Sequence, residues 1–126
     1  MTLLIDSHVL IWMLYEPTKI GTAAADSIHA ARRVAISVVS FWELALKHLK
    51  GKLPYAPEEL VRGANVLNLA ILELRSEHVP RLADVNLTHS DPFDRMLVAQ
   101  AMAEHAVLMT ADRNLLDSGY ETLAAR

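Results

Sequence analysis

Short apolar runs alternate with longer segments of helical periodicity along the chain. The short runs are rich in Leu, Ile and Val and predict strands at residues 3–5, 34–38, 69–74 and 106–109, with an edge strand at 120–123. The segments between them predict helices at 7–14, 18–31, 40–50, 57–65, 76–84 and 91–104, with a helical turn at 114–117. Continuous apolar strands separated by helices are typical of an α/β sandwich with a mostly parallel sheet.

Composition narrows the class of protein further. The chain has 126 residues, of which 52% are hydrophobic, and we expect a single domain over residues 1–126 with a full core. There are no cysteines, which excludes a disulfide scaffold, a thiolate metal site and a cysteine nucleophile. The net charge of −3 gives no general nucleic-acid footprint, so for a polyanionic substrate some local feature must overcome the global charge.

The length of the apolar runs also indicates whether the protein has a membrane segment. The uninterrupted run from Val9 to Tyr15 is far shorter than the roughly 20 residues that span a bilayer. The first residues lack the basic region of a signal peptide. We therefore expect no membrane segment and a cytoplasmic protein.

Four carboxylates follow the predicted strands at places that a parallel sheet would bring together. Asp6 ends the first strand, and Glu43 is expected in the first turn of the helix after the second. Asp94 lies in the first turn of the long late helix, and Asp112 follows the strand at 106–109. Ligands of open α/β sheets bind beyond the carboxyl ends of the strands, so these four side chains are candidate site residues.

Helix capping is the competing interpretation of the same acids. Ser40 with Glu43, and Asp91 with Asp94, have the spacing of a capping box, and Pro92 suits a first helical position. Asp112 stands in polar turn material. Taken singly, these acids fit capping better than catalysis, whereas Asp6 fits both equally well.

Taken together, the acids predict a metal. Two unit charges about 4 Å apart repel by about 4 kcal/mol at an effective dielectric of 20, so a cluster needs protons, basic partners or a divalent cation. Oxygen ligands without cysteine or paired histidine favour Mg²⁺, with Mn²⁺ as a substitute, over Zn²⁺. The hydroxyls of Ser7 and Thr110 could support carboxylates or only bond to the backbone.

Basic and aromatic residues near the acids have two interpretations each. Arg95 and Arg113 could contact phosphate or only neutralise their acidic neighbours. Lys47, Lys50 and Lys52 could form an RNA-binding strip or a solvated helix face. Trp42 and Phe93 fit core packing better than base stacking.

Three segments carry a resemblance to a known family: LLIDSHVLIWML at 3–14, AISVVSFWELALKHLKGKL at 35–53, and HSDPFDRMLVAQAMAEHAVLMTADRNL at 89–115. They resemble PIN-domain ribonucleases, and among these the VapC-type toxins of toxin–antitoxin pairs. The resemblance implies a three-layer α/β/α sandwich and Mg²⁺-dependent endoribonuclease activity, with metal-activated water as the nucleophile. It also implies a homodimer silenced by a cognate antitoxin. The family's acidic positions fall on Asp6, Glu43, Asp94 and Asp112, with Asp91 as an alternative to Asp94.

Two other functions remain open from the sequence. The chain could be a non-catalytic module that binds RNA or protein, with its acids acting only as caps. It could also be a phosphatase with Asp6 as the phosphorylated nucleophile, although such enzymes usually have a second Asp two residues later, where His8 stands.

Overall fold

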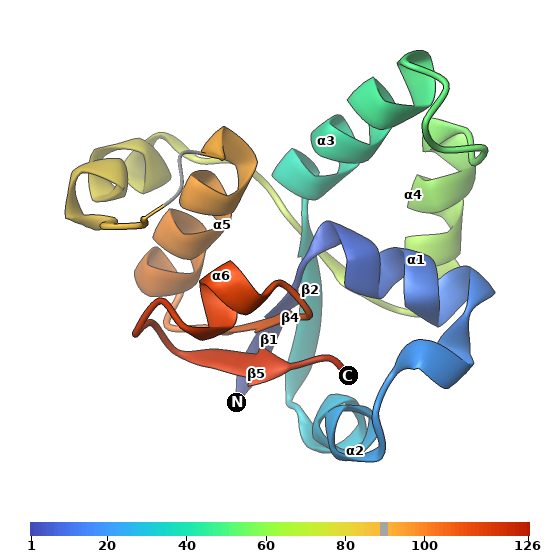
Figure 1. Ribbon diagram of the computed structural model, residues 1–126, viewed down its shortest axis with the longest axis horizontal. Helices are drawn as coiled ribbons and strands as arrows, with labels where there is room; N and C mark the ends of the chain where they lie inside the picture. The colour runs from blue at the N-terminus through green and yellow to red at the C-terminus, as the bar shows by residue number, and fades with distance from the viewer. Residues whose placement is uncertain (89–90) are drawn as a thin grey trace.

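The computed structural model describes residues 1–88 and 91–126 and contains a central parallel sheet. Within these residues the sheet has five strands in the order β3-β2-β1-β4-β5. Their bounds are β1 Thr2–Ile5, β2 Arg33–Ser37, β3 Ala70–Leu72, β4 Val107–Thr110 and β5 Thr122–Ala124. Helices lie on both faces of the sheet (Figure 1), which confirms the predicted three-layer α/β/α fold. Residues 89–90, which begin the third family-like segment, lie outside the described residues.

The helical elements fill the connections between the strands. Their bounds are α1 Ser7–Tyr15, η1 Pro17–Lys19, α2 Thr22–Ala30, α3 Val38–Leu49, α4 Pro57–Val66, η2 Ser76–Asp84, α5 Pro92–Ala103 and α6 Arg113–Leu116, of which η1 and η2 are 3₁₀ helices. None of the described helices is both long enough and apolar enough to cross a bilayer.

Strand residues alternate between two buried clusters because successive side chains point to opposite faces of a sheet. Leu3 and Ile5 pack with residues of α1, α2 and α4 on one face. Leu4 packs with residues of η2, α5 and α6 on the other. All three side chains are completely buried, so β1 is the hydrophobic centre of the molecule.

The predicted helix over 18–31 is wrong in its first turn. The chain instead forms η1, passes through extended residues Ile20 and Gly21, and begins α2 at Thr22. The N–H of Gly21 donates to the carbonyl of Ala125 at 2.9 Å. A Cβ at Gly21 would lie 2.8 Å from the carbonyl carbon of Arg126, so the absent side chain leaves room for the segment after β5.

The start of α3 also differs from the prediction. The helix begins at Val38 and is capped by Ser37, whose hydroxyl accepts from the N–H of Val39 at 3.0 Å. Ser40 is therefore not the cap, and its buried hydroxyl has no hydrogen-bond partner among the described atoms. Glu43 consequently lies in the second turn of α3 and is not part of a capping box.

Three other elements have shifted bounds or a different form. The strands predicted at 69–74 and 120–123 occur as β3 and β5, at 70–72 and 122–124. The helix predicted at 76–84 is 3₁₀ in form and contains Pro80. Proline has no N–H to donate, and its ring disfavours a continuous α-helix at this place.

A buried polar network ties η2 to α5. The Nδ1 of fully buried His78 accepts from the backbone N–H of Arg75 at 3.0 Å, and its Nε2 lies 2.9 Å from a carboxylate oxygen of Glu104. Gln100 joins this network because its side-chain nitrogen lies 3.3 Å from Nδ1 of His78, while its side-chain oxygen accepts from the hydroxyl of Ser37. The hydrogen bond from His78 holds the pKa of Glu104 below its ordinary value.

This network predicts a pH-dependent contribution to stability. Glu104→Gln keeps an acceptor for His78 but removes the charge, and should lower the free energy of unfolding by about 1 kcal/mol at neutral pH. A lowered carboxyl pKa stabilises the native state above the ordinary carboxyl pKa, and the contribution disappears as pH falls through the lowered pKa. Urea unfolding at neutral and acidic pH measures the difference.

The matched control is Glu16→Gln, because Glu16 is exposed and makes a 3.0 Å surface ion pair with Lys19, away from this network. Such pairs contribute little, so this variant should unfold like the wild type at both pH values. A Glu104→Gln deficit that persists unchanged in acid would contradict the assigned origin of the effect.

Candidate active site

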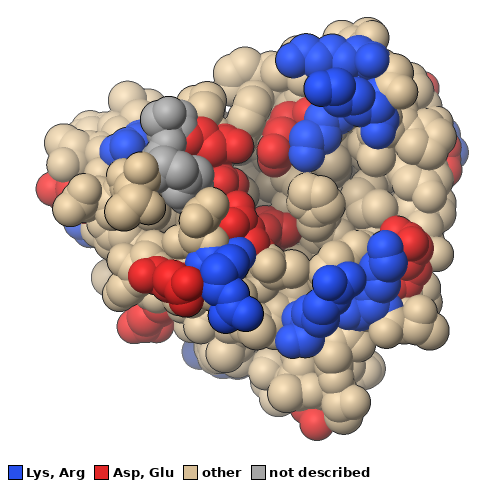
Figure 2. All heavy atoms as spheres, viewed as in Figure 1, with Lys and Arg blue, Asp and Glu red and all other residues tan. Residues whose placement is uncertain are grey.

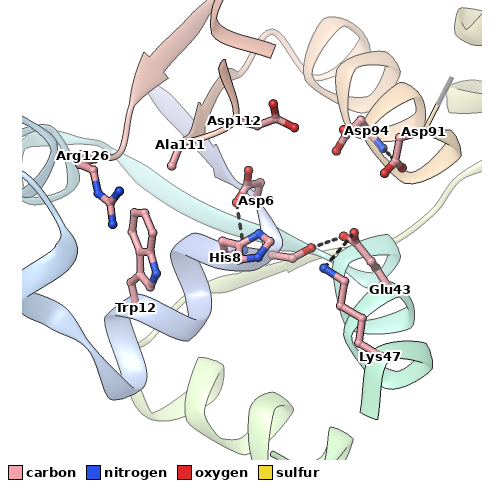
Figure 3. A pocket seen from close by; sticks show the side chains of 11 residues that line it. Asp6, His8, Trp12, Glu43, Lys47, Asp91, Asp94, Ala111, Asp112 and Arg126 are labelled. Carbon is pink, nitrogen blue, oxygen red and sulfur yellow. Dashed lines mark hydrogen bonds and ion pairs between the residues drawn. The ribbon is translucent and has the colours of Figure 1, made fainter. Parts of the chain in front are cut away.

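A hollow of about 380 Å³ lies at the carboxyl ends of β1 and β4, and residues of α1, α3, the start of α5 and the chain end after β5 also line it. It contains all four acids that the sequence singled out, together with the alternative Asp91 (Figure 3). The full lining is Asp6, Ser7, His8, Trp12, Glu43, Lys47, Asp91, Asp94, Ala111, Asp112 and Arg126. Acidic side chains gather at this hollow and basic groups lie around it (Figure 2).

Asp6 is the most enclosed of the acids, with 7% of its surface exposed. It caps α1: its Oδ1 accepts from the N–H groups of His8 at 3.0 Å and Val9 at 3.3 Å. Its Oδ2 accepts from the hydroxyl of Thr110. Burial nevertheless dominates over these bonds and raises the pKa of Asp6 above its ordinary value.

Glu43 reaches the hollow from α3 and is held from two sides. The hydroxyl of Ser7 donates to its Oε1, and the ammonium of Lys47 lies 3.7 Å from its Oε2. Lys47 stands one helical turn after Glu43, where the two side chains are neighbours on the same face. These contacts fix the Glu43 carboxylate next to the start of α1.

Asp91 and Asp94 approach the hollow together at the start of α5. Asp91 is the helix cap, and its Oδ1 accepts from the N–H groups of Phe93 at 2.8 Å and Asp94 at 3.2 Å. The capping role that the sequence predicted for Asp91 is therefore confirmed. Asp94 lies in the first helical turn, and both acids line the hollow.

Asp112 completes the acidic lining after β4. It caps the short helix α6 by accepting from the N–H of Asn114 at 2.9 Å. Its own N–H donates to the Thr110 hydroxyl at 3.0 Å, and that hydroxyl donates to Asp6. Thr110 thus joins two acids, while Ser7 contacts Glu43, so both predicted hydroxyl residues contact carboxylates.

The basic and aromatic neighbours of these acids behave differently from expectation. Arg95 donates to the carbonyl of Val85 at 2.7 Å and lines a separate apolar hollow, so it does not face the acids. Arg113 is exposed and is absent from the lining of the acidic hollow. Trp42 is 57% exposed and contacts Phe93 edge-on, with 5.1 Å between ring centroids, so its predicted core placement is wrong.

The donor set of the hollow fits a hard divalent cation. It offers carboxylates and hydroxyls without thiolates, and Mg²⁺ prefers oxygen ligands while keeping several of its waters. Among the described residues, the one group of three acidic or histidine side chains with ligand atoms within 4.8 Å of one another is Glu77, His78 and Glu104, outside the hollow. No three acids of the hollow come within that spacing in the described structure, so an ion there would be held directly by fewer than three of these carboxylates, with water between it and the others.

Sequence reasoning missed Arg126. Its guanidinium carbon lies 4.9 Å above the ring of Trp12, and both side chains line the hollow. Arg126 follows Asp112 by fourteen positions and belongs to no motif, so only the pairing of β5 with β4 shows that it returns to the site.

Comparison with known proteins shows the family. A model of the PIN domain matches residues 3–119, and this chain therefore belongs to the PIN-domain family. It is similar to Ribonuclease VapC22 of Mycobacterium tuberculosis (strain ATCC 25618 / H37Rv). The two are 34% identical over an alignment of 125 residues that covers 90% of this chain and 89% of the relative.

Solved structures show the same fold. VapBC2 from Rickettsia felis, bound to a DNA fragment from its promoter, includes a chain that superposes with a TM-score of 0.75 at 14% identity, with full coverage of both chains. DNA-bound VapBC from Salmonella typhimurium gives a TM-score of 0.73 at 17% identity, with 100% of this chain and 99% of that chain covered. At these identities the likeness establishes the architecture alone.

The enclosure of Asp6 predicts a trade-off between stability and ion binding. A raised carboxyl pKa means that the native protein loses stability as pH rises through that pKa, and the loss persists at neutral pH. Asp6→Asn removes the buried charge and should raise the melting temperature by a few degrees in EDTA at neutral pH. Millimolar Mn²⁺ should stabilise the wild type but not the variant.

Melting curves of both proteins, with EDTA and with Mn²⁺, measure this trade-off. The interpretation fails if Asp6→Asn melts below the wild type in EDTA and shows the same increase with Mn²⁺.

Proposed function

We propose that this protein is a Mg²⁺-dependent endoribonuclease that acts as the toxin of a type II toxin–antitoxin pair in the cytoplasm. The observation that carries the proposal is the gathering of five carboxylates around one hollow at the carboxyl ends of the strands. The 34% identity to Ribonuclease VapC22 supports ribonuclease activity as the chemistry of that hollow.

In this proposal Asp6, Glu43, Asp94 and Asp112 hold one or two Mg²⁺ ions, with Mn²⁺ as a substitute. Bound Mg²⁺ supplies positive charge that stabilises the negative charge developing on phosphate oxygens and makes water a better nucleophile. The carboxylates fix the position of the ion and balance its charge. The hydroxyls of Ser7 and Thr110 orient two of these carboxylates, so less reorganisation is required when RNA binds.

Asp91 has a supporting place in this mechanism. One of its oxygens already accepts two backbone N–H groups, which anchors it as the cap of α5. Asp94 projects from the turn that this cap fixes. At the start of α5 we therefore assign ion binding to Asp94, and we assign to Asp91 the orientation of the helix start.

Two alternative functions predict different biochemistry. In a non-catalytic module the acids would act only as caps, and Asp6, Asp91 and Asp112 do cap helices. Capping does not explain Glu43, which lies in the second turn of α3 and still faces the hollow. In a phosphatase Asp6 would attack phosphate, but both of its oxygens accept hydrogen bonds and it is 7% exposed.

We also propose that the protein forms a homodimer and binds an antitoxin. The VapBC structures from Rickettsia felis and Salmonella typhimurium share this fold, which supports an antitoxin partner. An apolar hollow between α3 and α5 supports the dimer, and the exposed Trp42 and Leu74 line it. Burying such a surface in a partner copy would remove apolar area from water.

The catalytic assignment predicts unequal effects at the two neighbouring acids of α5. Asp94→Asn should lower the rate of RNA cleavage by at least about a hundredfold, since electrostatic groups of an active site contribute about 10²–10³ in rate. Asp91→Asn should retain most activity, because asparagine caps helices as well as aspartate. Cleavage of single-stranded RNA with Mg²⁺ and circular dichroism of each variant measure both effects. Asp94→Asn activity within a few-fold of the wild type would remove Asp94 from the mechanism.

The dimer proposal makes a separate prediction. Trp42→Glu places a charge in the apolar hollow and should convert a dimer to a monomer, as measured by sedimentation equilibrium. Leu49→Glu is the matched control, because Leu49 is 78% exposed on the same helix and does not line that hollow. A Trp42→Glu protein that remains dimeric would place the interface elsewhere.

A further inference from the structure

Two basic side chains enter the otherwise acidic hollow from different elements. Lys47 extends from α3, and Arg126 extends from the segment that follows β5. Figure 3 shows Arg126 with Trp12 on one side of Asp6, and Lys47 with Glu43 on the other. In this view Asp6, one of the acids at which we propose that RNA is cut, lies between the two cations.

Arg126 is held by an aromatic ring, with no ion pair to a carboxylate side chain of the described residues. Its guanidinium lies over the ring of Trp12, a residue of α1 that is only 8% exposed and packs in the hydrophobic core. A cation–π contact leaves the N–H donors at the edge of the guanidinium plane available, and a guanidinium can bind two phosphate oxygens at once.

The backbone before Arg126 is fixed as firmly as its side chain. Ala125 is completely buried, its N–H donates to the carbonyl of Thr110 at 2.8 Å, and its carbonyl accepts from Gly21 at 2.9 Å. The missing side chain at Gly21 permits this approach, because a Cβ there would lie 2.8 Å from the Arg126 carbonyl carbon. The break between η1 and α2 thus serves the placement of Arg126.

A fixed cation in this hollow would offset the repulsion between its acidic side chains and a polyanion. The chain has a net charge of −3, and five carboxylates line the hollow, so the site by itself repels a polyanion. Basic side chains that neutralise phosphates provide the sequence-independent part of nucleic-acid affinity. Lys47 is partly engaged by Glu43 at 3.7 Å, whereas Arg126 has no such competitor among the described carboxylates.

We propose that Arg126 is a phosphate-binding residue, and that it and Lys47 hold the RNA backbone on the two sides of the bond at the acids. The proposal rests on the proposed ribonuclease function and assigns the path of the RNA strand across that site. In this arrangement Arg126 binds and positions the strand but takes no part in proton transfer or ion binding. Gly21 and Trp12 are positioning residues that act through Arg126.

Binding without cleavage tests this proposal directly. A short fluorescein-labelled single-stranded RNA is titrated with protein in EDTA, and anisotropy is recorded over a range of salt concentrations. Arg126→Gln should weaken binding by about fivefold to tenfold and reduce the slope of log K against log salt by about 0.7, the value for one phosphate contact on a single strand. Arg32→Gln is the matched control, because Arg32 is exposed beside the start of β2, at the opposite end of the strands.

Gly21→Ala provides an independent variant that leaves the arginine in the sequence. Its methyl group should displace the Arg126 backbone and weaken RNA binding in the same direction. Combining it with Arg126→Gln should add little further loss, because both changes remove the same contact. In the cleavage assay Arg126→Gln should raise KM by about fivefold with kcat within about twofold, and should retain the increase of melting temperature with Mn²⁺.

The outcomes separate this proposal from the proposed function. Arg126→Gln binding that matches Arg32→Gln in affinity and salt slope would overturn the phosphate-binding role, even if the wild type cleaves RNA. A fall in kcat with unchanged KM would also overturn it. If the wild type binds RNA through Arg126 but never cleaves it with Mg²⁺ or Mn²⁺, the path of the strand stands and the endoribonuclease proposal fails.

Discussion

The burial of one carboxylate, that of Asp6, is the constraint on which the rest of the site depends, because burial disfavours its negative charge. Asp6 directly follows β1, in which Leu3, Leu4 and Ile5 are completely buried, and is itself 7% exposed; burial raises its pKa although it accepts three hydrogen bonds. Four more acids line the same hollow. Such an arrangement costs stability unless a cation compensates it, which is typical of sites that bind ions for function.

The parallel sheet is the cause of this convergence. In a parallel sheet the carboxyl ends of all strands lie at one edge, and the helices that follow begin there. The same geometry explains why the acids also cap helices: Asp6, Asp91 and Asp112 each bind N–H groups of a helix start. The same side chain can therefore cap a helix and bind an ion. A cap uses only some of the lone pairs on the two carboxylate oxygens, and the others can still bind an ion.

The features that could be predicted from the sequence are those that depend on local sequence pattern. Apolar strand runs and helical periodicity determine the order of elements, so the sandwich and the gathering of Asp6, Glu43, Asp94 and Asp112 could be derived. Features that depend on long-range contacts could not. The cap of α3 is Ser37 and not Ser40 because Ser37 also contacts Gln100 of α5. The helix break at Gly21 and the placement of Arg126 depend on each other across the whole chain, and no local pattern signals either.

The most direct test of the central claim is a crystal structure of the protein soaked in Mn²⁺, with anomalous scattering recorded at the manganese edge. The account predicts a peak in the hollow, bound by oxygens of Asp6 and Asp94 and by water, and no peak in an Asp94→Asn crystal. A wild-type crystal with no manganese in the hollow, or with manganese only at Glu77, His78 and Glu104, would contradict the account. In that case the acids of the hollow would be helix caps and not an ion site.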